Sequence, residues 1–158
     1  QEVLEHIRDA EQHYVALFKD TPVGFGFIKI NKTNLYLSGD AVCLEHQGKG
    51  LHTLLTIARI VYGRMIGCDS VSVRTQNPRV EYSVRKAFRT LGIPFELERI
   101  FKKAHYGRRL STYPYVCPER EINDIYSGLD VERGDAFELL FRLPAVQITK
   151  EYRRICCI

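Results

Sequence analysis

The sequence predicts an α/β (α+β) fold, with a mixed, mostly antiparallel central sheet flanked by helices. Two β-rich runs separated by a turn at 20–22 predict an antiparallel hairpin. Two later segments carry apolar residues at helical spacing and end at a glycine, and strand candidates alternate with them. Helical crossovers of this kind join strands of one sheet, and the 158 residues fit one domain, 1–158.

The first part of the chain predicts one short helix and three strands. Residues 2–11 have an apolar stripe at helical spacing, and the runs 14–19 and 23–30 form the hairpin. A third strand is predicted at 35–44. The second hairpin strand contains two glycines that favour close backbone approach or a bulge, Gly24 and Gly26.

The middle of the chain predicts two helices around one strand. Apolar residues recur at helical spacing over 51–66, and residues 71–75 alternate as a strand does. Asn77 and Pro78 then break the strand and open a second helix, which ends at Gly92.

The last part is richer in strands. Strands are predicted at 95–101 and 136–143, with a short helix at 121–129 between them. Residues 105–119 show little periodicity and contain two prolines. An edge strand is predicted over 146–152.

Composition excludes several classes of protein. No apolar run approaches the roughly 20 residues of a membrane span. The five cysteines are odd in number, scattered and without CxxC spacing, which argues against a disulfide framework or a metal site and favours a cytoplasmic protein. The net charge of +4 suits an acidic cofactor. Its densest basic stretch, from Arg99 to Arg109, is interpreted as a solvated strand and turn in preference to a nucleic-acid surface.

A glycine-rich loop at 47–52 lies between the third strand and the first long helix. Gly48 and Gly50 allow the backbone to approach a phosphate, and the N–H groups of a helix start bind anions. Lys49 adds a positive charge and Thr53 a hydroxyl. The mononucleotide and dinucleotide phosphate-loop patterns do not match. By itself the loop is equally well explained as a turn that closes a strand-to-helix junction.

The loop and its neighbours resemble the acetyl-CoA signature of the GNAT N-acetyltransferase superfamily. This signature is an apolar strand, then [RQ]-x-x-G-x-[GA], then a long helix; Gln47 and Gly50 match it, and His52 departs from the last small residue. The resemblance is best over 14–101. It leaves 102–135 as an insertion or acceptor-side segment and 136–158 as C-terminal strands.

The resemblance implies an acyl-CoA N-acyltransferase fold and activity. Acetyl-CoA, or another acyl-CoA, would be the co-substrate, and the acyl group would pass directly to an amine in a ternary complex. The strand before the loop would splay from its neighbour and bind pantetheine through the main chains of Val42 and Cys43. The oxyanion donor would be a strand N–H near Cys43. Pyrophosphate would contact the loop and helix start at Gln47, Gly48, Lys49, Gly50, His52 and Thr53. Asn77 would border the cofactor arm, a role compatible with capping the following helix.

The catalytic groups of the family are not matched residue for residue. The family's frequent glutamate and tyrosine positions hold Tyr36 and Phe88 here. Asp40 is the first choice for the base and Glu45 the next, although Asp40 is equally explained as a bulge residue after Gly39. Tyr82 is the candidate to replace the family's tyrosine as general acid, but a role in packing or simple surface exposure is slightly favoured for it. Two further residues are interpreted as non-catalytic: Cys43 as a small buried hydrophobic residue and His46 as a solvent-exposed loop residue.

The acceptor is predicted only by class, as an amine-bearing small molecule or a protein amine. Tyrosines of the insertion either line its pocket or pack in the interior: Tyr106, Tyr113, Tyr115 and Tyr126. The final apolar strand, 136–143, is a candidate for pairing across a homodimer. A non-catalytic acyl-CoA-binding domain is the main alternative, and a basic nucleic-acid or partner-binding module is a weaker one.

Overall fold

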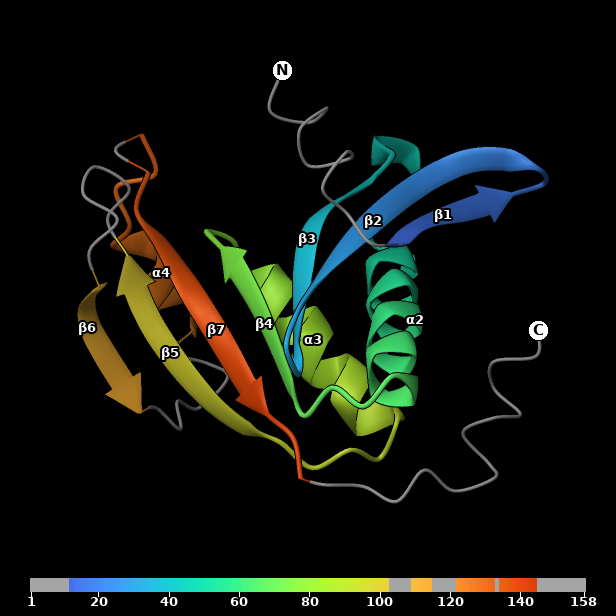
Figure 1. The fold of residues 1–158 in the computed structure, drawn as a ribbon. Coiled ribbons are helices and arrows are strands. Elements are labelled where there is room, and N and C mark those ends of the chain that lie inside the picture. The colour runs from blue at the N-terminus through green and yellow to red at the C-terminus, as the bar shows by residue number, and fades with distance from the viewer. Residues whose placement is uncertain (1–11, 103–108, 115–121, 133, 145–158) are drawn as a thin grey trace.

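The computed structural model describes residues 12–102, 109–114, 122–132 and 134–144 (Figure 1). The predicted helix at 2–11 and edge strand at 146–152 lie outside these residues. The elements, in chain order, are β1 Gln12–Phe18, β2 Thr21–Asn31, β3 Asn34–Val42, the 3₁₀ turn η1 Leu44–His46, α2 Leu51–Met65, β4 Ser70–Thr75, α3 Pro78–Thr90, β5 Glu96–Lys102, β6 Arg109–Pro114, α4 Ile122–Ser127 and β7 Ala136–Arg142.

The described strands form one mixed sheet in the order β1-β2-β3-β4-β7-β5-β6. Every neighbouring pair is antiparallel except β3 and β4, which are parallel and joined by α2. The predicted fold class and hairpin are therefore confirmed. Strand β6 was not predicted, because its short run ends at a proline and lacks clear alternation.

Strand β7 lies inside the sheet. It pairs with β4 along one edge and with β5 along the other. The prediction that this apolar strand pairs across a homodimer is therefore wrong, because both of its edges are occupied. Its apolar sequence reflects a central position in the sheet.

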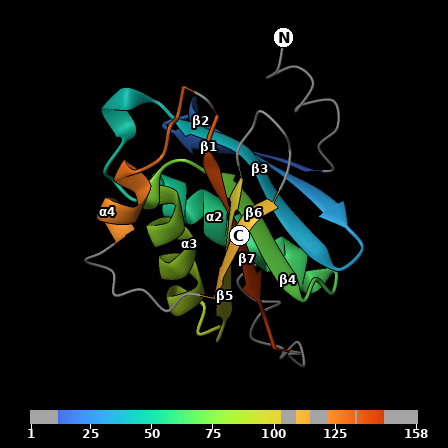
Figure 2. The ribbon, with the colours of Figure 1, turned by 90° about the vertical axis from the view of Figure 1, so that its left-hand side faces the viewer.

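The described helices cover one face of the sheet. Figure 2 shows α3 and α4 on the same side, and α2 packs against α3 there. The alternate residues of the central strands that face these helices form the core, together with the inner sides of α2 and α3: Leu35, Leu37, Val71, Val73, Leu139, Phe141, Ile60, Val84, Ala87 and Phe88. The other face carries no described helix. None of the helices in the described ranges is long and apolar enough to cross a membrane.

Candidate cofactor and acyl-transfer site

A gap opens between the two parallel strands. Strand β3 pairs with β4 at Asn34, Leu35 and Tyr36, and the pairing ends there. Beyond Tyr36 the strands diverge toward their carboxyl ends, as Figure 1 shows, while β3 stays paired with β2. The splayed strand predicted before the loop is present in this structure.

A bulge bends β3 within this divergent part. Gly26 faces Asp40, but the next residue, Phe27, faces Ser38, so Gly39 has no opposing residue. Gly39 has a φ of 47°, a left-handed conformation that favours glycine. Gly39 is thus the bulged residue, and Asp40 is a regular strand residue whose side chain turns toward α2.

The helix α2 begins with an uncapped first turn. Its first helical bond runs from Leu54 N–H to Gly50 O at 3.0 Å, so the N–H groups before Leu54 have no acceptor within the helix. The N-cap Gly50 has no side chain to cap them, and this turn contains no acidic residue. These donors and the helix dipole favour a bound anion.

The glycines of the loop are required by backbone conformation. Gly48 and Gly50 have φ values of 74° and 82°. A Cβ on either residue would meet no atom of the chain within 4 Å. Packing therefore does not require a glycine at either position, and the space beside the backbone is open to a ligand. Lys49 is exposed between them.

The main-chain donors of the gap belong to Val42 and Asp40. Cys43 donates its N–H to Val23 O at 2.8 Å on the β2 side. Main-chain groups alternate sides along a strand, so the N–H groups of Val42 and Asp40 point toward the gap instead. The Cys43 carbonyl accepts from His46 N–H at 2.9 Å, so the predicted main-chain binding of pantetheine by Cys43 does not fit this structure. A strand N–H that could serve as the predicted oxyanion donor would be that of Val42 or Asp40. The Val42 carbonyl accepts a hydrogen bond from Gln47 Nε2 at 3.0 Å.

Asp40 is held by two side chains of α2. Its Oδ2 lies 2.5 Å from Arg59 Nη2 and 3.1 Å from His52 Nε2. Burial raises the pKa of the Asp40 carboxyl, but the contacts with His52 and Arg59 outweigh it and lower the pKa to about 2. A carboxylate held in this way accepts a proton poorly, so these contacts favour a positioning role for Asp40 over that of a general base.

The arginine of this cluster is fully buried. Arg59 also donates to Leu55 O at 3.2 Å and to Phe27 O at 3.4 Å. Its guanidinium lies over Gly26, where an added Cβ would be 3.1 Å from Arg59 Cζ. The glycine predicted to allow close approach therefore accommodates an arginine side chain.

Two of the remaining predicted cofactor residues, His52 at the start of α2 and Asn77 at the start of α3, have side chains engaged within the chain. The His52 side chain faces Asp40, so the group of His52 available to a phosphate is its main-chain N–H in the first turn of α2. The Asn77 side chain caps α3, accepting from Arg79 N–H at 2.9 Å, and Pro78 follows it at the helix start. Thr53 is half-buried in the first turn of α2.

The predicted catalytic residues do not converge. Glu45 is exposed in η1, and Tyr82 is 50% exposed on α3. Phe88, at the family's tyrosine position, is fully buried against Phe95 and Phe141. Two further predictions are wrong. Cys43 was expected to be buried but is exposed. His46 was expected to be exposed but is half-buried, with its ring centroid 5.2 Å from that of Phe18.

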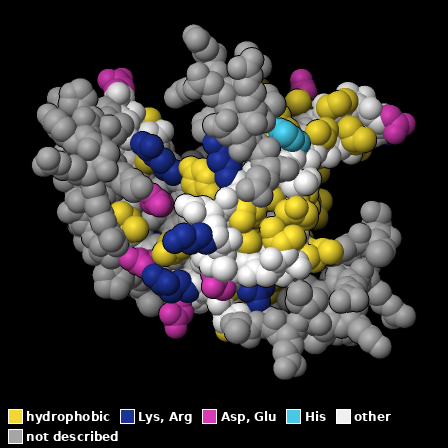
Figure 3. Space-filling view, in the orientation of Figure 1, with side chains coloured by type: hydrophobic (Ala, Val, Ile, Leu, Met, Phe, Trp, Pro, Cys, Tyr) yellow, Lys and Arg dark blue, Asp and Glu magenta, His cyan; other side chains and the backbone are white. Residues whose placement is uncertain are grey.

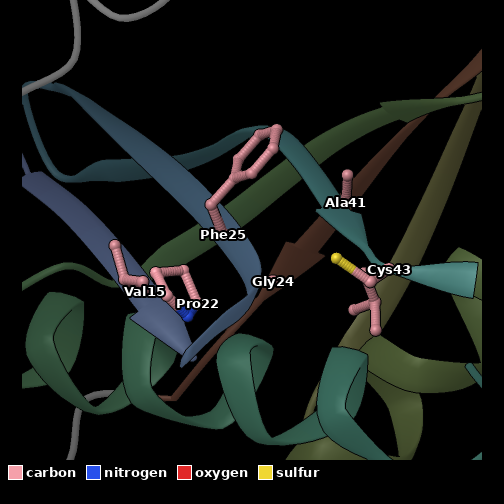
Figure 4. A pocket seen from close by; sticks show the side chains of 7 residues that line it. Val15, Pro22, Gly24, Phe25, Ala41 and Cys43 are labelled. Atoms are coloured by element: carbon pink, nitrogen blue, oxygen red, sulfur yellow. The ribbon is translucent and has the colours of Figure 1, made fainter. Parts of the chain in front are cut away.

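A shallow apolar pocket of about 440 Å³ lies beside the carboxyl end of β3. Figure 4 shows Phe25, Ala41 and the Cys43 sulfur around it, with Val15 and Pro22 at its other side. It contains no titratable side chain other than the Cys43 thiol.

A second buried ionic cluster was not predicted. Glu81 of α3 is fully buried; its carboxylate contacts Arg99 of β5, accepts a hydrogen bond from Tyr126 Oη of α4 at 3.0 Å, and lies 3.2 Å from Arg85 Nε. Burial and Glu81 raise the pKa of Tyr126. The interpretation of Arg99 as part of a solvated basic stretch is wrong, because its side chain is buried. Of the two alternatives left open for Tyr126, the structure shows packing in the core. The side chains of the other tyrosines predicted with it, Tyr106, Tyr113 and Tyr115, lie outside the part of the chain that the structure describes.

Comparison with known proteins gives the fold its context. No family model and no curated protein matches this chain. Solved structures do match. The chain has the GNAT fold. The likeness extends to the ribosomal-protein-S18-alanine N-acetyltransferase from Escherichia coli, with a TM-score of 0.58 and 14% identity over 95% of this chain and 80% of that one.

Two further matches are structures with CoA or acetyl-CoA bound. A Bacillus subtilis acetyltransferase in complex with CoA has a TM-score of 0.56 and 18% identity over 90% of this chain and 83% of that one. A GNAT family acetyltransferase from Elizabethkingia anophelis with acetyl-CoA bound has a TM-score of 0.56 and 13% identity over 90% and 82% of the two chains.

Proposed function

We propose that this chain is an acyl-CoA-dependent N-acyltransferase that moves an acetyl or other acyl group directly to an amine. The observation that carries the proposal is the gap between β3 and β4, which opens beside an uncapped helix start and a glycine loop. A thioester arm needs an extended slot with main-chain partners, and a pyrophosphate needs clustered N–H donors. This site offers the two together, and solved structures of the same fold hold CoA or acetyl-CoA.

The pyrophosphate would lie at the start of α2. The open backbone of Gly48 and Gly50, the first-turn N–H groups of His52 and Thr53, and the Lys49 ammonium would bind it. Gln47 would support the loop through its bond to Val42 O. The pantetheine arm would run in the gap toward Asn77, along the main-chain groups of Val42 and Asp40 that face it. Because β3 and β4 are parallel, their carboxyl ends and the starts of α2 and α3 lie at the same end of the sheet.

The reaction would join a neutral amine to the thioester carbonyl. The amine nitrogen forms the new C–N bond, the C–S bond breaks, and the thiolate of CoA takes a proton. The N–H of Val42 or Asp40 would stabilise the oxyanion. Asp40 would act by holding His52 and Arg59, and so the start of α2, against β3.

Isothermal titration calorimetry with acetyl-CoA and longer acyl-CoAs tests the cofactor site. We expect binding, weakened about 10-fold by Lys49→Ala, because one phosphate contact is lost. Lys32→Ala, in the β2–β3 turn, is the matched control and should bind as the wild type does. Absence of binding to any CoA species would reject the proposal.

A free-thiol assay over a panel of primary amines then tests catalysis. Release of CoA that depends on an amine supports the transferase. Binding without release would instead support the alternative of a non-catalytic acyl-CoA-binding domain.

A further inference from the structure

The two faces of the sheet differ at the gap, and this difference decides how an acceptor approaches. On one face, Leu37 and Val73 border the gap and belong to the core beneath α2 and α3. Side chains alternate along a strand, so Tyr36 of β3 and Ser72 and Arg74 of β4 project to the opposite face. An amine that attacks a thioester in the gap must therefore come from this opposite, acceptor face.

The acceptor face carries a cross-strand polar group. Tyr36 lies opposite Ser72, and Arg74 lies opposite Glu138 of β7. Directly opposed residues project to the same side of a sheet, and Leu139 beside Glu138 faces the core. Tyr36, Ser72, Arg74 and Glu138 thus form one group, which we name the acceptor-face group. Figure 3 views this face, where side chains of both charges lie near an apolar patch.

The position of this group matches the place where pairing ends. Tyr36 and Ser72 are the last pair between β3 and β4. Arg74 and Glu138 lie two residues further, toward the open end of the gap. Glu138 is half-buried, and it places a carboxylate on β7 directly opposite Arg74 of β4.

The members also interact electrostatically. Burial raises the pKa of the Tyr36 phenol, the negative charge of Glu138 raises it further, and Arg74 lowers it in part. Arg74 is exposed, and its Nη2 donates to Gly134 O at 3.4 Å in the turn before β7. The Tyr36 hydroxyl therefore stays protonated at neutral pH, within electrostatic range of the Glu138 carboxylate.

We propose that Glu138 is the catalytic base for a protonated primary amine and that Tyr36 relays the second proton, an assignment that rests on the proposed transferase function. The Glu138 carboxylate binds the ammonium and takes one proton. The amine attacks the thioester carbonyl, and the C–N bond forms as the C–S bond breaks. The Tyr36 hydroxyl gives its proton to the thiolate and receives one from the nitrogen, and Glu138 then releases its proton to water.

Glu138→Gln tests the assignment, because it removes the charge and keeps the shape. We expect acetyl-CoA affinity within 2-fold of the wild type by calorimetry, and kcat in the free-thiol assay lowered about 10²-fold. Tyr36→Phe should lower kcat about 10-fold or more. The matched control is Glu98→Gln, a half-buried glutamate on the same face of β5 that pairs with Arg142 at 3.5 Å, and it should keep its kcat.

The results separate this assignment from the function on which it rests. Turnover by Glu138→Gln within 3-fold of the wild type would overturn the role of Glu138 and leave the transferase intact. Wild-type protein that binds no CoA species, or binds it and acylates no amine of the panel, would overturn both. Rescue of the slow Glu138→Gln variant by a higher pH, at which the amine is already neutral, would support a base over a structural role.

Discussion

Two carboxylates, Asp40 and Glu81, each contact a buried arginine of another element, but their surroundings differ. Glu81 is fully buried, and its contacts with Arg99 and Tyr126 join α3, β5 and α4. The Asp40 side chain is 20% exposed at the edge of the gap, and both of its partners lie on α2. The same pairing therefore serves two purposes. One cluster joins α3 and α4 to β5, and the other links β3 to the helix that follows the proposed cofactor loop.

The largest expected effect is on stability, from Glu81→Ala. Arg99 and Tyr126 would stay buried without their carboxylate, and breaking such a pair costs about 3–5 kcal/mol of unfolding free energy. Urea unfolding measures this loss. Glu96→Ala, at an exposed position of β5, is the control and should stay within about 0.5 kcal/mol of the wild type. A loss below about 1 kcal/mol for Glu81→Ala would contradict a closed structural cluster.

The second effect is smaller and depends on pH. Asp40→Asn removes a carboxylate whose pKa is lowered from 3.8 to about 2, which corresponds to about 2 kcal/mol of stability. Because the folded pKa is the lower one, this stability is present above about pH 4 and is lost as the pH falls toward 2. The difference in unfolding free energy between wild type and Asp40→Asn should shrink by about half between pH 5 and pH 3.

A constant difference over that range would show that the ion pair does not supply the stabilisation. Asp130→Asn, which changes an exposed carboxylate, provides the control for charge alone and should not reproduce the pH dependence.

The smallest effect on stability is expected from His52→Ala. The His52 side chain is 27% exposed, so its contact with Asp40 contributes less than about 1 kcal/mol. Of the two α2 side chains that contact Asp40, however, His52 is the one in the first turn, so its loss should lower acetyl-CoA affinity a few-fold in calorimetry. His13→Ala, on β1, is the control. If His52→Ala destabilised the fold as strongly as Glu81→Ala, the distinction between the two clusters would fail.

The acceptor-face group adds a third contrast, because its polar residues lie on the face without described helices. Tyr36 occupies the position at which the resemblance leads one to expect a glutamate. Residues adjacent in space but 102 positions apart in the chain, Tyr36 and Glu138, supply the proposed replacement. Only the order of the strands brings them together.

Local patterns in the sequence determined most of the elements. The strand at 71–75, the helices that start at Leu51 and Pro78, the Asn77 cap and the glycine loop were predicted, because periodicity, capping and left-handed backbone are properties of neighbouring residues. The third strand ends at Val42 and not at residue 44, since the bond from Cys43 to Val23 is followed by a 3₁₀ turn.

Tertiary structure decided what each charged residue does. From the sequence, Arg99 was expected in a solvated basic stretch, but β5 places it against Glu81. Asp40 was the first choice for the catalytic base, but Arg59, whose guanidinium lies over Gly26, pairs with it. The central place of β7 and the position of Glu138 followed from long-range pairing alone. Periodicity records which side of an element is buried, but the partner of a buried charge depends on which elements meet, and that is a property of the whole chain.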